Sequence, residues 1–165
     1  MEPRLDRVEG FRYRSLCVAD TIRLGESFGM NARVGLVLIL SGPLGAGKTH
    51  FVRGLARGLG IESGVRSPTF TICQVYPGRI DLYHLDAYRV DDPDELLLQG
   101  FDEMVDSGVV AIEWGERVTP ILPVGRIELQ ITPAGEEERE IRAVPRGELE
   151  HAWLGDLPAE LWLSS

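Results

Sequence analysis

The stretch "GLVLILSGPLGAGKTH", residues 35–50, decides the fold of this 165-residue chain. Its first six residues are an apolar run, which is typical of a strand buried on both faces of a parallel sheet. The next residues complete G-x-x-x-x-G-K-[ST], the pattern of a glycine-rich loop whose backbone N–H groups bind nucleotide phosphates. Apolar residues at positions 51, 55 and 59 then recur at helical spacing. Strand, loop and helix therefore follow one another in the order that a phosphate-binding loop requires.

The loop predicts which groups contact the nucleotide. The amides of Gly45, Ala46 and Gly47 are expected to face phosphate oxygens, since glycines let the backbone approach closely. Lys48 reaches the β- and γ-phosphates, and the Thr49 hydroxyl binds Mg²⁺. Lys48 is the only lysine beside 16 arginines, and a guanine-specific [NT]-K-x-D motif cannot occur without a second lysine. The predicted ligands are therefore ATP and Mg²⁺. The alternative is a glycine-rich turn that matches the pattern by chance.

Two acidic residues compete to complete the metal site. Glu113 ends the apolar run 109–112, and Asp86 ends the run 80–85. Ligands of open parallel sheets bind at the carboxyl ends of the strands, so both acids qualify if their strands point that way. The alternative for each acid is a solvated carboxylate at a strand end.

The remainder of the chain predicts helices and strands in a mixed α/β arrangement. Gly54 and Gly58 weaken the helix that follows the loop, by about 1 kcal/mol each relative to alanine. Close packing against the sheet would explain them, and a frayed helix is the alternative. The further predicted elements are a helix over 19–30 with Asp20 as its N-cap, a hairpin of strands 69–76 and 79–86, a helix from Asp92 to Gly100, a short helix at 101–108, a strand over 109–114, antiparallel strands at 126–133 and 139–144, and a small helix within 149–165.

Composition limits the class of protein. The length fits a single domain, residues 1–165, and the polar N-terminus favours a cytoplasmic protein. The net charge of −9 argues against a free-standing nucleic-acid binder, which needs clustered cations. Cys17 and Cys73 are expected to be buried, reduced thiols. Residues 81–116 contain eleven acids and one base, which either keep the protein soluble or steer it onto a basic partner.

Four motifs in order resemble the TsaE (YjeE) family. They are "GPLGAGKT", "SPTFT" some twenty residues later, "YHLDAYR" followed by "DPDEL", and "IEW". The resemblance covers about residues 16–122, and His50 stands where the family usually has a second threonine. Members of this family are small bacterial P-loop ATPases needed for threonylcarbamoyladenosine at position 37 of tRNAs. The resemblance implies a P-loop NTPase-like, doubly wound sheet with parallel and antiparallel strands. It also implies a TsaD–TsaB heterodimer as partner, which itself contacts the tRNA.

The resemblance also implies roles for individual residues. Thr49 and Glu113 look like the Mg²⁺ ligands, with the carboxylate acting directly or through water. Asp86 looks like the acid that orients the attacking water, and Lys48 like the phosphate-stabilising cation. Thr69, in the segment 67–69, looks like a switch residue near the γ-phosphate. The segment near Val18 aligns with the part that lies against adenine.

Three residues allow two interpretations each. Trp114 is either an aromatic contact to the nucleotide or partner, or an ordinary core tryptophan. His84 shares a strand face with Asp86, so it is either a proton relay or a half-buried, hydrogen-bonded histidine. Arg89 either contacts phosphate or forms a salt bridge with one of the nearby acids.

The predicted function is therefore an ATP-binding, weakly hydrolysing subunit that resets or activates a tRNA-modifying complex. The chain is not expected to transfer the threonylcarbamoyl group itself, since no acyl-transfer constellation is evident in the sequence. Two alternatives remain: a small-molecule P-loop kinase, and a nucleotide-sensing module whose hydrolysis is incidental. A kinase normally needs an arginine-bearing lid, and residues 81–116 offer one arginine.

Overall fold

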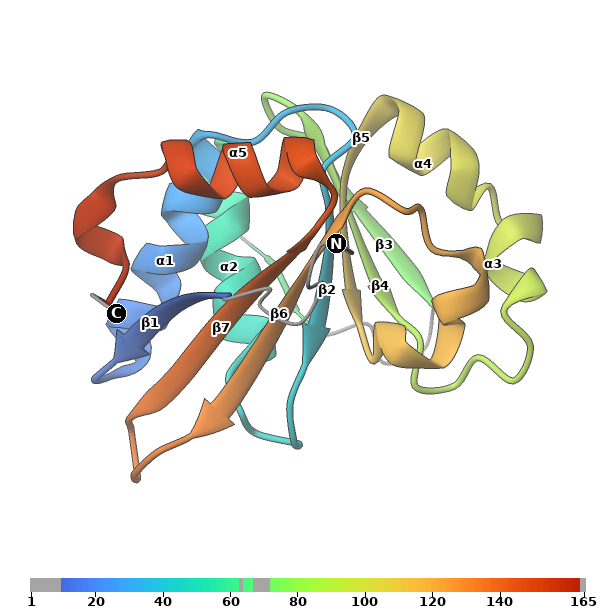
Figure 1. The fold of residues 1–165 in the computed structure, drawn as a ribbon. Coiled ribbons are helices and arrows are strands. Elements are labelled where there is room, and N and C mark those ends of the chain that lie inside the picture. The colour runs from blue at the N-terminus through green and yellow to red at the C-terminus, as the bar shows by residue number, and fades with distance from the viewer. Residues whose placement is uncertain (1–9, 63, 67–71, 164–165) are drawn as a thin grey trace, which may run out of the picture.

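The computed structural model describes residues 10–62, 64–66 and 72–163, and its centre is a seven-stranded sheet (Figure 1). None of the helices in this described part of the chain is long and apolar enough to cross a membrane. The elements, in chain order, are β1 (Phe11–Ser15), α1 (Val18–Met30), β2 (Val37–Ser41), α2 (Lys48–Gly58), β3 (Cys73–Tyr76), β4 (Asp81–Asp86), α3 (Asp94–Leu98), α4 (Phe101–Ser107), β5 (Gly108–Glu113), the 3-10 helix η1 (Gly115–Ile121), β6 (Arg126–Pro133), β7 (Arg139–Arg146), α5 (Glu148–Asp156) and the 3-10 helix η2 (Ala159–Leu161).

The sheet has the strand order β1-β7-β6-β2-β5-β4-β3 and mixes both directions of pairing. The central strand β2 is parallel to β5 and to β6, and β5 is parallel to β4. Antiparallel pairs complete both edges, with β3 on β4 at one side and β7 between β6 and β1 at the other. The mixed α/β sheet expected from the sequence is thus confirmed, as is the antiparallel pairing of the strands predicted at 126–133 and 139–144, the second of which extends to Arg146 in the structure.

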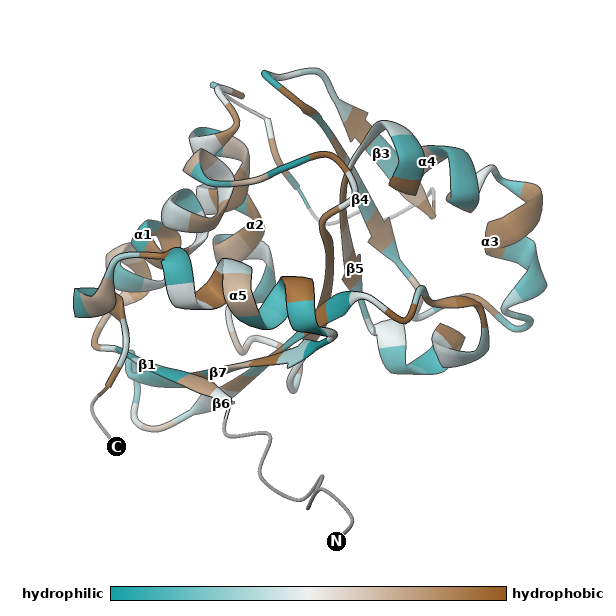
Figure 2. Cartoon of the chain, turned by 45° about the horizontal axis from the view of Figure 1, so that its top comes forward, coloured by the Kyte–Doolittle hydropathy of each residue, from teal (hydrophilic) through white to brown (hydrophobic). Residues whose placement is uncertain are grey.

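Helices cover the two faces of the sheet and create two apolar cores. Side chains of α1, α2 and α5 pack on one face with Leu38 and Leu40 of β2. On the other face α3, α4 and η1 pack with Val37 and Ile39 of the same strand. Strand β5 is buried throughout, and Figure 2 shows it hydrophobic along most of its length. The central strands are therefore enclosed on both sides, as the continuous apolar runs predicted.

Four glycines let α1 and α2 cross in close contact. A Cβ at Gly54 would overlap the carbonyl oxygen of Ile22 in α1, and one at Gly58 would lie 2.6 Å from the amide nitrogen of Met30. Gly25 and Gly29 make the reciprocal approach to the backbone of α2. The close packing inferred for Gly54 and Gly58 is real, but the expectation that the sheet is the partner was wrong.

We expect Gly54→Ala to destabilise the protein by about 2 to 3 kcal/mol, because its methyl group meets backbone that cannot rotate away. This loss outweighs the gain in helix propensity of about 1 kcal/mol. Gly155 in α5 is a matched control, since nothing lies within 4 Å of a Cβ built there. Gly155→Ala should stabilise by about 0.5 to 1 kcal/mol. Urea unfolding measures both variants, and equal stability of the two would contradict the crossing argument.

The structure corrects several details of the predicted elements. The first helix begins at Val18 with Cys17 as N-cap, so Asp20 is not the cap. Instead the Asp20 carboxylate accepts a hydrogen bond from the amide of Leu16 at 2.9 Å. The second hairpin strand begins at Asp81 rather than 79, and the part of the first strand at 69–71 lies outside the described residues. Strand β1 was not predicted, and the single C-terminal helix is replaced by α5 and η2.

Both cysteines are free thiols, as predicted, although each is only partly buried. Burial raises the pKa of Cys73 from 9.0 to about 11. The thiolate is the reactive form, so at pH 8 the native protein should present roughly a hundredfold less of it at Cys73 than the unfolded chain. We expect iodoacetamide to alkylate native Cys73 about a hundredfold more slowly than in urea. The native rate should rise as pH increases towards 11. Equal rates in both states, measured by peptide mapping, would contradict this burial effect.

Candidate functional site

A cavity of about 700 Å³ opens at the carboxyl ends of β2, β4 and β5. The loop residues 44–50 form one wall, and Asp86 and Glu113 form another. Because β2, β5 and β4 are parallel neighbours, their carboxyl ends lie at the same edge of the sheet. The sheet therefore brings the glycine-rich loop and both candidate acids to one cavity.

The loop has the geometry of an anion-binding turn. Gly45 and Gly47 have φ values of 80° and 108°, in the left-handed region that favours glycine. Helix α2 begins at Lys48, directly after the loop. Among the described residues, no acceptor is recorded for the amides of Gly47, Lys48 and Thr49. The Ala46 amide, which was expected to face phosphate, instead donates to the carbonyl oxygen of Pro43 at 3.0 Å. The amides of residues 47–49 stand at the positive end of the helix dipole, so they are available to a bound anion.

Lys48 is held in place inside this cavity. Its side chain is buried, and Nζ donates a hydrogen bond to the carbonyl oxygen of Gly42 at 2.8 Å. The same ammonium lies 3.9 Å from the ring centroid of Trp114. Burial lowers the pKa of Lys48, while the charges of Glu113, Glu116 and Asp86 oppose that shift. A buried cation with one backbone acceptor and an aromatic ring is well prepared to meet additional negative charge.

The two acids stand opposite each other across β4 and β5. Asp86 pairs with Glu113 in the strand register, and Leu40, the penultimate residue of β2, pairs with Glu113 from the other side. Neighbouring strands lie about 4.8 Å apart, so the two carboxylates and the loop share one small region. The sequence left open whether these strands point towards the loop. In the structure both do.

A buried histidine orients Glu113. His84 is fully buried, and its Nε2 lies 2.7 Å from Glu113 Oε2. The Nδ1 atom has no hydrogen-bond partner among the described residues, so the proton belongs on Nε2, which donates to the carboxylate. The hydrogen-bonded interpretation of His84 is thus correct, but the residue is completely rather than half buried. Its contact fixes the direction in which the Glu113 carboxylate faces.

Asp86 keeps one oxygen available for a ligand. Its Oδ1 accepts a hydrogen bond from the amide of Tyr88 at 2.9 Å, which fixes the turn after β4. No hydrogen bond to Oδ2 is recorded within the described part of the chain. The side chain is partly buried and lines the cavity, so a water molecule can reach it.

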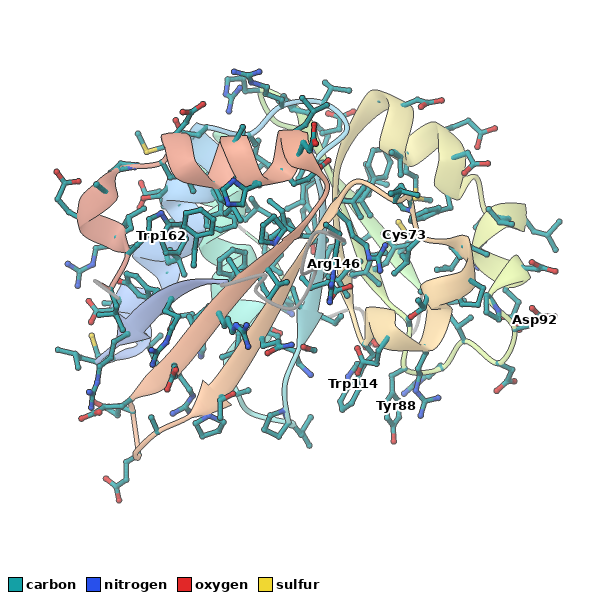
Figure 3. All side chains as sticks on the ribbon, in the orientation of Figure 1. Cys73, Tyr88, Asp92, Trp114, Arg146 and Trp162 are labelled. Carbon is teal, nitrogen blue, oxygen red and sulfur yellow. The ribbon has the colours of Figure 1, made fainter. Side chains whose placement is uncertain are left out.

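Aromatic side chains form the outer wall of the cavity. Trp114 and Tyr88 lie side by side at the edge of the molecule in Figure 3, with ring centroids 5.3 Å apart. Trp114 has φ 60°, the only positive value recorded for a non-glycine residue among those described. Such a conformation is costly and is often kept at functional sites. Trp114 is therefore a half-buried residue that lines the cavity and also packs against the apolar core on its side of the sheet, so each of its two interpretations holds in part.

All but one of the described residues that were predicted for the site line this cavity. Val18 is exposed at the start of α1 and does not line the cavity. Thr69 lies outside the described residues. Arg89 is exposed, and no carboxylate pairs with it in the described ranges, so the salt bridge expected for it is not found. Five further residues line the cavity without having been predicted for it: Leu44, His50, Arg53, Arg66 and Tyr88.

The donor set around the cavity suits Mg²⁺ only together with a phosphate ligand. In the residues that the structure describes, no group of three or more histidine, cysteine or acidic side chains forms a metal cluster. Mg²⁺ characteristically uses one or two carboxylates, with substrate phosphates and water completing its shell. The Thr49 hydroxyl and the Glu113 carboxylate, both lining the cavity, fit that pattern.

Fold and cavity together define a P-loop NTPase-like α/β protein. The family described as "Threonylcarbamoyl adenosine biosynthesis protein TsaE" matches residues 17–141, and the chain belongs to this family. The chain is 45% identical over 123 residues to the tRNA threonylcarbamoyladenosine biosynthesis protein TsaE of Treponema pallidum, covering 74% of this chain and 91% of that protein. It is 42% identical over 132 residues to the Bacillus subtilis protein of the same name, covering 79% and 82%.

A solved structure agrees with this assignment. The crystal structure of Bacillus subtilis YdiB superposes with a TM-score of 0.78 at 34% identity. The match covers 90% of this chain and 93% of that one. The resemblance stated from four motifs is thus confirmed, and the family names connect the chain to the biosynthesis of threonylcarbamoyladenosine in tRNA.

Proposed function

We propose that this protein is an ATP-binding, weakly ATP-hydrolysing subunit required for threonylcarbamoyladenosine formation at position 37 of tRNAs. The observation that carries the proposal is the convergence of Asp86, Glu113 and the free amides of the loop on one cavity. An anion-binding turn without acids would suit a passive phosphate site. The two aligned carboxylates add the groups that metal-assisted hydrolysis requires.

In this proposal each group of the chain has a separate task. The amides of residues 47–49 and the Lys48 ammonium bind the triphosphate and stabilise charge on its β- and γ-phosphates. Thr49 and Glu113 would hold Mg²⁺, which when bound would neutralise phosphate charge. Asp86 accepts a hydrogen bond from water and orients it towards the γ-phosphorus. A bond from the water oxygen to phosphorus forms while the bond to the bridging oxygen breaks. One water proton moves to a phosphate oxygen, and ADP and dihydrogen phosphate leave.

The partner that we propose is a TsaD–TsaB-like heterodimer, with tRNA contacted only indirectly. The net charge of −9 disfavours direct binding to a tRNA backbone and suits a more basic protein partner. We propose the cytoplasm as the location of the protein, since its tRNA-modifying partner would act there. The transferase chemistry belongs to the partner in this proposal.

Two linked measurements test the proposed function. The chain should be retained on an immobilised TsaD–TsaB pair, and retention should differ with and without ATP. Multiple-turnover tRNA modification by the three proteins should require ATP and fail with its β,γ-imido analogue. Equal output with the analogue would favour a nucleotide sensor, and absence of any retention would contradict the partner. Phosphorylation of a small metabolite by the pure protein would favour a kinase.

A further inference from the structure

Arg139, the first residue of β7, connects the β6–β7 hairpin to the outside of the phosphate loop. Its Nε donates to the carbonyl oxygen of Ala46 at 2.8 Å, and one terminal nitrogen donates to that of Gly45 at 3.4 Å. The other terminal nitrogen donates to three carbonyls of the hairpin turn, at Gly135, Glu136 and Glu138. One guanidinium therefore joins two loops that lie 93 residues apart in the chain.

These bonds fix the orientation of a peptide in the loop. In a trans peptide the carbonyl oxygen and the following N–H point in opposite directions. Holding the Ala46 carbonyl on the outside therefore turns the Gly47 amide towards the inside, where no acceptor is recorded for it within the described chain. Glycines leave such a peptide free to rotate unless another group holds it. Arg139 supplies the group that holds it.

The contact acts on the loop through geometry and through charge. No carboxylate pairs with Arg139 among the described residues, so its charge is not neutralised by an ion pair. The Arg139 charge also affects the cavity wall. The pKa of His50 is lowered mainly by burial, then by the charge of Arg53 and then by that of Arg139. The hairpin also supports the start of the loop, since a Cβ at Gly42 would overlap the carbonyl oxygen of Ile131 in β6.

We propose that Arg139 is a positioning residue that holds the phosphate loop in its anion-binding conformation by capping the carbonyls of Gly45 and Ala46. The inference rests on the proposed function for its ligand, the triphosphate of ATP. This positioning role gives the β6–β7 hairpin a function, and none had been inferred for it from the sequence. The fork of donors, rather than charge alone, performs that task, because carbonyls of two separate loops must be bound at once.

Calorimetry with the β,γ-imido analogue of ATP and Mg²⁺ tests the proposal on four proteins. Arg139→Gln should weaken binding by about tenfold or more, as expected for hydrogen bonds to a charged donor. Arg139→Lys keeps the charge. It should restore less than half of the binding free energy that Arg139→Gln loses. Arg146→Gln is the matched control, because Arg146 lies at the other end of β7 and pairs with Glu128 instead. It should bind like the wild type.

NMR order parameters of the amides at residues 45–47 provide a second readout without any nucleotide. They should fall in Arg139→Gln and remain unchanged in Arg146→Gln. Wild-type affinity in Arg139→Gln, or full recovery in Arg139→Lys, would overturn the positioning role. A wild-type protein that binds no nucleotide would contradict the proposed function instead, and unchanged order parameters would then still overturn the inference.

Discussion

Replacing Lys48 with alanine is expected to lower ATP turnover by at least about a hundredfold and to weaken ATP binding. The ammonium is buried beside Gly42 and Trp114, and no other lysine exists in the chain to replace it. Removal of one fixed cationic or donor group that stabilises transition-state charge typically costs a factor of about 10² to 10³. Release of phosphate under saturating ATP measures turnover, and calorimetry measures binding.

The same substitution is expected to leave the ligand-free protein as stable as the wild type, or slightly more stable. Burial lowers the pKa of Lys48, so the folded state carries the cost of a desolvated charge that alanine removes. Arg57→Ala on the same helix is the matched control, because Arg57 is exposed and lies outside the cavity. It should change neither turnover nor binding. Wild-type hydrolysis by Lys48→Ala would contradict the role that we assign to the lysine.

Local sequence pattern was sufficient to predict the phosphate loop, the strand before it and the helix after it. An apolar run, a motif with fixed glycines and a helical repeat each depend on neighbours in the chain, so residues 35–59 could be interpreted without knowing the fold. The strand at 126–133 was predicted with its observed bounds for the same reason. The alternation of apolar and polar residues along this strand indicates that one face of it is buried.

Features that depend on distant contacts could not be predicted. Gly54 and Gly58 indicated that another backbone packs closely against their helix. The absence of a Cβ does not identify that backbone, which in the structure belongs to α1. Strand β1 has a short alternation of its own, and among the described strands it pairs with β7 alone, near the other end of the chain. Arg139 binds carbonyl oxygens, which every residue carries, so no sequence signal identifies its partners.

The candidate site shows the same division. Each acid was recognised because it ends an apolar run, whereas their common edge follows from strand order, which the sequence did not specify. Tyr88 lines the cavity because the Asp86 carboxylate holds the turn that carries its amide. The position of that ring depends on this turn and on the neighbouring Trp114. The roles of Asp86 and Glu113 in hydrolysis remain predictions that kinetics must test.

The second large effect is expected at Asp86. Asp86→Ala should still bind ATP, but should hydrolyse it at least about a hundredfold more slowly, the usual contribution of a positioned acid–base group. Asp86→Asn is the sharper variant, because its amide oxygen can still accept from the amide of Tyr88 and keep the turn. Asp81→Asn, at the opposite end of β4, is the matched control and should hydrolyse ATP normally. Multiple-turnover hydrolysis at the wild-type rate by either Asp86 variant would refute its role.

Dependence on Mg²⁺ separates Asp86 from its neighbour Glu113. If Glu113 holds the metal, Glu113→Gln raises the Mg²⁺ concentration needed for half-maximal turnover, and excess Mg²⁺ restores part of the rate. If Asp86 orients water, Asp86→Asn lowers the maximal rate and leaves that concentration unchanged, because no additional metal replaces a hydrogen bond to water. The two residues face each other in the register of β4 and β5, so a merely structural disturbance would affect both quantities in both variants. Rescue of Asp86→Asn by Mg²⁺ would reassign Asp86 to the metal and leave the attacking water without an identified orienting residue.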